Sequence, residues 1–135
     1  MNQKKAAPAI PVHELSRYFR VPARGIAVDY PGREILLQSR ITNISSRGVF
    51  VRTRRPFLVG TRISIAFCLP TADRAINATT VVRWSTASQP NERPKGVEIA
   101  DGMGLEFVRI ARPDRKAIER YIENFIVRMR SGKSA

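Results

Sequence analysis

The stretch Asn43-Ile44-Ser45-Ser46-Arg47-Gly48 separates two runs, Ile35 to Thr42 and Val49 to Thr53, that alternate in the manner of β-strands. Asn and Ser side chains hydrogen-bond to nearby backbone groups in turns, and glycine adopts conformations, often with positive φ, that a Cβ disfavours. The stretch therefore predicts the turn between two strands of a β-hairpin.

Further short runs alternate in the same manner on both sides of this hairpin. Turn signals such as Pro31-Gly32 and a polar loop from Ser85 to Gly96 separate them, with no helical pattern between. The runs are Ile26 to Tyr30, Ile63 to Leu69, Ile76 to Trp84 and Met103 to Ile110. We therefore expect a mainly β protein of about six strands, a small antiparallel barrel or sandwich; a six-stranded β-barrel would also hide the edges of the sheet by closure.

The last part of the chain has a helical pattern. Pro113 suits the first turn of a helix, and Asp114 suits its positive end. Apolar residues then recur at helical spacing, at Ile118, Tyr121, Ile122, Phe125, Ile126 and Met129. We predict a C-terminal α-helix over 113–130 that covers a barrel mouth or one face of the sheet. A helix that binds a partner protein is the alternative.

Length and net charge limit the number of domains and the classes of partner. The 135 residues suffice for one domain, which we place at 15–130, between a flexible basic tail at 1–14 and a short tail at 131–135. The net charge of +13 favours anionic partners such as nucleotides, nucleic acid, acidic proteins or an anionic membrane face. The same charge is also compatible with a role in solubility alone.

The chain has one cysteine and one histidine, which limits the disulfides and metal sites that it can form. Cys68 has no partner for an internal disulfide, which suits a buried thiol in a reducing cytoplasm, and His13 has no companion ligands for zinc. Neither a signal peptide nor the roughly twenty apolar residues of a spanning helix is present. Nucleophile triads, paired carboxylates and phosphate-binding glycine loops are also missing from the sequence. We expect a non-catalytic cytoplasmic protein without a cofactor, metal site or membrane span.

A cluster of arginines precedes the first predicted strand. The cluster consists of Arg17, Arg20 and Arg24. The stretch from Met1 to Arg24 contains one acidic residue, Glu14. Arginine carries a permanent charge and a planar set of donors that suit phosphate, and Asn and Ser at a tight turn hydrogen-bond to a base or ribose. The cluster and the turn together suit a phosphorylated nucleotide.

These two features resemble the PilZ domain family. Its motifs are Arg-x-x-x-Arg before the first strand and, about twenty residues later, Asp or Asn-x-Ser-x-x-Gly, which is Asn43-x-Ser45-x-x-Gly48 here. Leu69-Pro70, Val81 to Trp84 and Gly102 to Phe107 are further matching landmarks, and the likeness covers Ser16 to about Met129. The resemblance implies a PilZ-type barrel with a closing helix that acts as a receptor for cyclic di-GMP.

The resemblance also implies that arginines grip the phosphates and guanines of cyclic di-GMP while the turn forms the opposite wall. Arg20 and Arg24 have the literal motif spacing. If Arg20 instead runs directly into the first strand, Ser16 takes the first motif position, with Arg17 beside it. We favour this second register. The predicted ligand-binding residues are Arg17, Arg20, Asn43, Ser45 and Gly48, with Arg24 and Arg47 as further candidates.

Three functions compete at this point. The first is a cyclic di-GMP effector that passes binding to an unidentified protein partner, in motility or surface behaviour. The second is a degenerate PilZ adaptor that works through protein contacts alone, which Ser16 supports; such adaptors are linked in the family to motility, type IV pilus or polarity systems. The third is nucleic-acid binding by a small basic barrel, but few aromatic residues are available as stacking platforms, so we do not expect specific nucleic-acid recognition.

Overall fold

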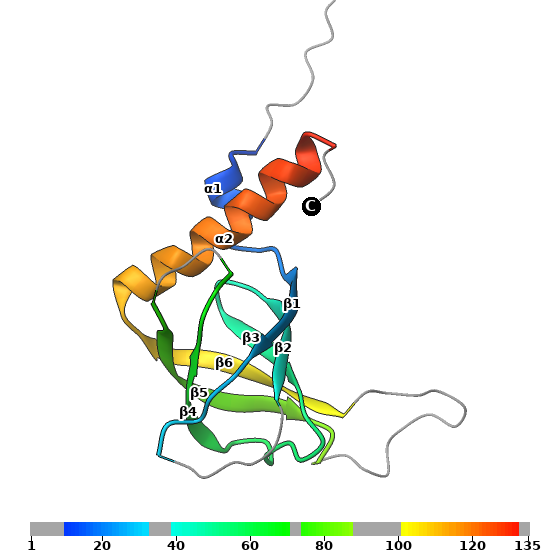
Figure 1. The fold of residues 1–135 in the computed structure, drawn as a ribbon, viewed down its shortest axis with the longest axis vertical. Helices are drawn as coiled ribbons and strands as arrows, with labels where there is room; N and C mark the ends of the chain where they lie inside the picture. Colours follow the sequence, from blue (N-terminus) through cyan, green and yellow to red (C-terminus); the bar gives the residue numbers. More distant parts are fainter. Residues whose placement is uncertain (1–9, 33–38, 71–73, 88–100, 133–135) are drawn as a thin grey trace, which may run out of the picture.

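A computed structural model describes residues 10–32, 39–70, 74–87 and 101–132, apart from the side chain of Arg24. Residues 1–9 and 133–135 of the predicted tails, 35–38 of the predicted second strand and 88–96 of the predicted polar loop lie outside the described residues. Six strands and two helices form in the described ranges (Figure 1). In chain order they are α1 Val12–Leu15, β1 Val21–Ala27, β2 Arg40–Ile44, β3 Gly48–Arg52, β4 Arg62–Phe67, β5 Ile76–Ser85, β6 Gly102–Ile110 and α2 Arg112–Arg130.

The strands form one antiparallel sheet in the order β1-β2-β3-β6-β5-β4. The mainly β fold with six antiparallel strands and a C-terminal helix is thus confirmed. The expected closed barrel is not, because β1 and β4 remain the two edges of the sheet. Past the end of β1, one isolated bridge between Asp29 and Ala66 joins the edges, with N···O distances of 2.8 and 2.9 Å.

Strand alternation places the core where the sequence predicts it. In β4, Ile63, Ile65 and Phe67 are buried while the intervening residues point away from the core. β5 follows the same pattern as far as Val82, where a shift in pairing with β6 inserts one residue. The shift turns Trp84 outward, where its indole is 37% exposed and lies 5.7 Å from the ring of Phe50. Strict alternation after Val82 would bury Trp84, but the shift exposes it, and Ser85 is buried instead.

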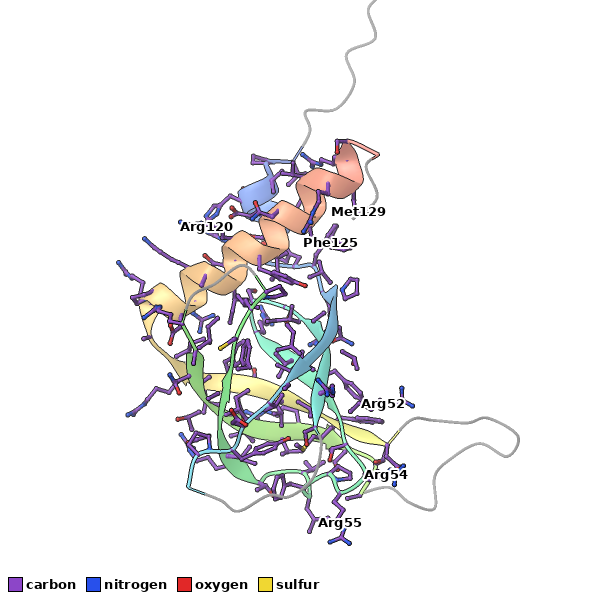
Figure 2. All side chains as sticks on the ribbon, in the orientation of Figure 1. Arg52, Arg54, Arg55, Arg120, Phe125 and Met129 are labelled. Carbon is purple, nitrogen blue, oxygen red and sulfur yellow. The ribbon has the colours of Figure 1, made fainter. Side chains whose placement is uncertain are left out.

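The closing helix α2 lies across one end of the sheet, beside α1 (Figure 1). Ile118, Ile122 and Ile126 form its buried stripe, as the spacing predicts. Met129 belongs to the same predicted stripe but is 64% exposed, because the last turns of α2 extend beyond the sheet (Figure 2). The stripe therefore covers the sheet along the first part of the helix only.

Polar contacts fix the start of α2 on the sheet. The buried carboxylate of Asp114 accepts hydrogen bonds from Arg74 Nη2 at 2.7 Å and from the backbone N–H of Asn77 at 3.3 Å. At its middle, the Tyr121 hydroxyl donates to the carbonyl of Pro22 in β1 at 3.3 Å. These contacts hold α2 over the end of the sheet at which β1 begins.

Two further expectations need correction. Cys68 follows β4 directly and is exposed, since it occupies the outward-facing side of the alternation that buries Phe67 and Leu69. Val12 to Glu14, assigned to a flexible tail from the sequence, are helical in α1. A single turn is too short to be detected from apolar periodicity, and α1 is held by contacts with α2.

Candidate functional site

The arginine segment and the β2–β3 turn meet at one hydrogen bond. Arg20 lies directly before β1, and its Nη1 donates to Oδ1 of Asn43 at 2.5 Å, across 23 positions in the sequence. Desolvation of the packed part of this side chain lowers the pKa of the Arg20 guanidinium, although an arginine keeps its charge at neutral pH. The predicted arginine and the predicted turn are thus neighbours in space.

A β-bulge in β2 explains the orientation of Asn43. The pairing of β2 with β3 shifts between Ile41 and Asn43, so that Thr42 is an extra residue. Ile41 and Ile44 both remain buried, while Asn43 lies opposite Pro22 of β1. Neighbouring positions on one face of paired strands are within reach of long side chains, and this register brings Asn43 next to Arg20.

Ser45 uses its hydroxyl to build the turn. The Oγ atom accepts the backbone N–H of Arg47 and of Gly48, each at 3.2 Å, and lies 3.3 Å from the carbonyl oxygen of Gly48, to which it donates. The backbone N–H of Ser45 also donates to that carbonyl, at 2.9 Å. Because Ser45 is buried, we assign it the role of shaping the turn rather than that of a free ligand donor.

Gly48 is needed for a different reason from the expected one. Its φ is not positive. A Cβ added at Gly48 would instead lie 1.9 Å from the carbonyl oxygen of Leu105 in β6. The glycine therefore allows the backbones of β3 and β6 to approach closely at the turn.

Two residues that sequence analysis did not single out fasten the turn to the rest of the protein. Ser46 Oγ donates to the backbone carbonyl of Arg17 at 3.1 Å, and Arg115 Nη1 of α2 donates to the carbonyl of Ser46 at 2.9 Å. Ser46 lies within the motif but at a variable position, and Arg115 has the pattern of a solvated helix face. Neither carries a sequence signal that would have revealed its contact.

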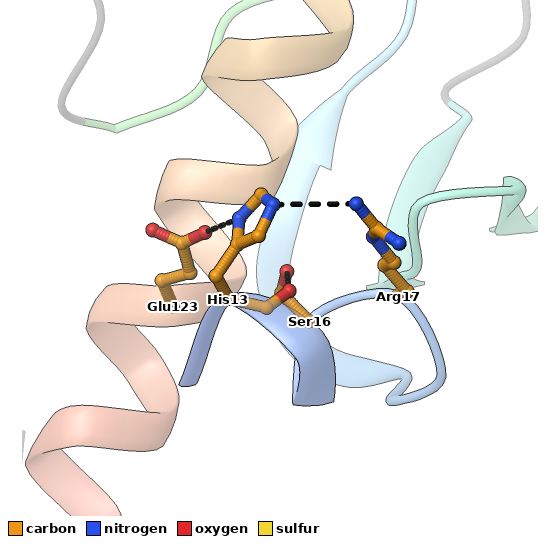
Figure 3. A network of polar contacts seen from close by, with 4 residues as sticks. All are labelled: His13, Ser16, Arg17 and Glu123. Carbon is orange, nitrogen blue, oxygen red and sulfur yellow. Dashed lines mark hydrogen bonds and ion pairs between the residues drawn. The ribbon is translucent and has the colours of Figure 1, made fainter. Parts of the chain in front are cut away.

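The arm formed by residues 10–20 is attached to α2 through a polar network (Figure 3). His13 Nδ1 lies 2.9 Å from Glu123 Oε2, and Arg17 Nη2 lies 3.4 Å from His13 Nε2. A guanidinium only donates, so this geometry fits a hydrogen on Nδ1 that is donated to Glu123. Arg17 is exposed, and its side chain contacts His13 of α1 rather than Asn43.

Ser16 is fully buried beneath this network. Its hydroxyl donates to the carbonyl of His13 at 2.7 Å and so closes the turn of α1 (Figure 3). A long charged side chain does not fit such a site without rearrangement of the arm. The structure thus gives Ser16 a local structural role.

The two further candidate arginines lie at the edges of the site. Arg24 is inside β1, four positions beyond Arg20, whereas Arg20 immediately precedes the strand. This placement favours the register in which Arg20 is the last arginine of the motif. Arg47 is exposed at the tip of the turn, where its backbone carbonyl accepts the N–H of Phe107 at 2.7 Å.

The described residues provide neither a metal site nor a membrane-spanning helix. They contain no group of three or more His, Cys, Asp or Glu side chains placed to hold a metal ion. No helix in the described part of the chain has the length and apolar character needed to cross a bilayer. The site is therefore built from arginine, amide, hydroxyl and backbone groups, which suit an anionic, hydrogen-bonding ligand.

Comparison with known proteins agrees with this fold. The Bacillus subtilis inhibitor of motility MotI/DgrA matches with a TM-score of 0.62 and 26% sequence identity over 85% of this chain, which spans 50% of that structure. A search of curated protein sequences gave no match. A family model, that of the PilZ domain, matches residues 14–124, which include residues 14–20 of the arm, the turn, the whole sheet and most of α2, so the chain belongs to the PilZ domain family.

Proposed function

We propose that the chain is an effector domain that binds cyclic di-GMP between the arm and the β2–β3 turn and passes binding to a protein partner. PilZ domains are non-catalytic receptors for cyclic di-GMP. The observation that carries the proposal is the contact between Arg20 and Asn43, which brings the two motif segments together. Both residues present polar groups that suit a nucleotide ligand.

In the proposed complex, Arg20 and Arg17 bind the phosphates or guanine edges, and Asn43 contributes its amide. Ser45 and Gly48 keep the turn in shape, and Arg24 and Arg47 are candidates for outer contacts. A hydrogen bond to a charged group contributes about 1.5 to 3 kcal/mol, so a few such contacts, offset by the entropy of association, support roughly micromolar binding.

Arg17 supplies a route from the ligand to a partner. Its guanidinium contacts His13, which in turn contacts Glu123 of α2. A phosphate that captures Arg17 removes the first of these contacts and changes how the arm lies on the helix. The arm and the exposed end of α2 are then the surface that a partner senses. By analogy with the matched inhibitor of motility, we propose a motility-related output for a protein located in the cytoplasm.

One observation favours a second candidate function, that of an adaptor which does not bind nucleotide. Ser16 stands at the first position of the arginine motif in the favoured register, and its side chain is buried with its hydroxyl bonded to His13. An adaptor would use the same fold for protein contacts alone.

Titration calorimetry with cyclic di-GMP separates the two candidates. We expect saturable binding that Arg20→Ala weakens at least tenfold, whereas Arg109→Ala, a matched change of an exposed arginine on β6, leaves it unchanged. Cyclic GMP and cyclic di-AMP serve as ligand controls. No saturable heat at tens of micromolar protein, with the unfolding transition intact, would reject the effector function and leave the adaptor. Limited proteolysis with and without ligand then reports whether the arm changes.

A further inference from the structure

We propose that the chain carries a second anion-binding site, at the end of the β2–β3 hairpin away from the turn, which takes a compact oligophosphate group. A pocket of about 350 Å³ lies there, lined by Arg40, Arg52, Thr53, Arg54 and Asp101. Figure 2 shows Arg52 and Arg54 at the end of the sheet that lies away from α2. This site is separate from the arm and turn and does not depend on the function proposed above.

The pairing of two arginines is the main observation. Arg40 of β2 and Arg52 of β3 are direct cross-strand partners, and both are exposed. Such partners place their Cβ atoms about 4.5–5.5 Å apart, where like charges destabilise a sheet. An anion bound between the two arginines would reduce this repulsion, so the pairing favours an anionic ligand.

Neither of these arginines is neutralised within the described part of the chain. Ion pairs form there between Arg74 and Asp114 and between Arg83 and Glu106, but none involves Arg40, Arg52 or Arg54. Arg40 donates from Nη1 to the carbonyl oxygen of Gly25 at 3.0 Å, which orients the guanidinium without cancelling its charge. Asp101 is the one acidic residue among the described residues of the lining, so its three arginines leave these residues with a net positive charge.

The backbone around the pocket is held in place before any ligand arrives. The N–H of Thr53 donates to the carbonyl of Asp101 at 3.1 Å, and Thr53 Oγ1 accepts the N–H of Arg55 at 3.3 Å. Arg52 ends the β3–β6 ladder opposite Gly102. A backbone that is ordered in this way reduces the entropy lost when an anion binds.

The lining indicates the class of ligand. Three arginines, from two strands and the loop that follows β3, line the pocket, and a guanidinium group suits a pair of phosphate oxygens. The described residues that line the pocket are arginine, threonine and aspartate, which favour recognition of phosphate rather than of a base. Inorganic oligophosphates and the phosphate chain of a nucleoside triphosphate both present the required chemistry.

The test is calorimetric titration of the full chain, in low salt without divalent cations, with inorganic tripolyphosphate and, in a second arm, with ATP. We expect saturable binding that Arg40→Gln and Arg52→Gln each weaken at least tenfold. Arg62→Gln, which removes an exposed arginine from the edge strand β4, is the matched control and should leave binding unchanged. Tighter binding of ATP than of tripolyphosphate would identify nucleotides as the source, and equal or weaker binding would identify oligophosphates.

Two results would overturn the proposal: no saturable heat with either probe, or an equal loss with Arg62→Gln, which indicates diffuse attraction to a basic protein. Unfolding curves confirm that the variants fold. Chemical shift changes at the Thr53 and Asp101 amides of the unaltered protein give an independent location for the probe. Cyclic di-GMP binding should be unaffected by Arg52→Gln, so failure of this site is distinguishable from failure of the arm site.

Discussion

Arginines make different contacts at the two ends of the β2–β3 hairpin. At the turn, Arg20 and Arg115 donate to Asn43 and to the carbonyl of Ser46, and both hold the arm and α2 in place. At the far end, Arg40 and Arg52 face each other across the ladder without an ion-pair partner in the described residues. The same residue type therefore serves structure at one end and supplies unneutralised charge at the other. Net charge alone does not distinguish these roles.

The largest expected effect on the unfolding free energy comes from a substitution at Gly48, at the turn end of the hairpin. Gly48→Ala places a methyl group against the Leu105 carbonyl, so β3 and β6 must separate, at a cost of about 3 kcal/mol of unfolding free energy. Urea denaturation measures the loss. Gly104→Ala is the matched control, because its added Cβ would meet only the Trp84 Cβ, at an ordinary 3.7 Å. Equal stabilities for the two variants would show that the close approach at Gly48 is not a constraint.

A smaller effect is expected when the turn loses its internal hydrogen bonds. Ser45→Ala leaves the backbone N–H groups of Arg47 and Gly48 without their acceptor, which costs about 1–2 kcal/mol of unfolding free energy. The same denaturation experiment applies, with the exposed serine change Ser64→Ala on β4 as control. If Ser45→Ala is as stable as the control, the hydroxyl is not what shapes the turn.

The smallest effect, with opposite sign, is expected at the far end. Arg52→Gln removes the repulsion from Arg40 and should raise the unfolding free energy by roughly 0.5 kcal/mol in low salt. The gain should fade toward zero near 1 M salt, where the screening length is about 3 Å. Thermal unfolding over a salt series measures it, and a loss of stability in low salt would contradict the like-charge interpretation.

Alternation and motif spacing predicted much of the fold and the meeting of arm and turn. Period-2 patterns located β4 and most of β5, because burial on one face decides which residues each strand needs. Helical spacing located α2 to within one residue of its start. Local patterns carry this information because each element must bury a continuous apolar face.

What the sequence did not predict depends on contacts between distant segments. The outward turn of Trp84 follows from a one-residue shift against β6, which the alternation of the β5 sequence does not reveal. The collision that makes Gly48 necessary involves Leu105, and the fastening of the turn involves Arg115. The open sheet likewise depends on how far the β1 and β4 edges approach. None of these is determined by neighbours along the chain.

The single bridge between Asp29 and Ala66 has a mechanical consequence for the arm site. A closed ladder would oblige β1 and β4 to move as one body, whereas two hydrogen bonds form a seam that opens and recloses at small cost. Arg20 sits at the other end of β1 from this seam. We therefore expect β1 to shift more readily against β4, which it meets at this bridge, than against β2, with which it pairs at both of its ends.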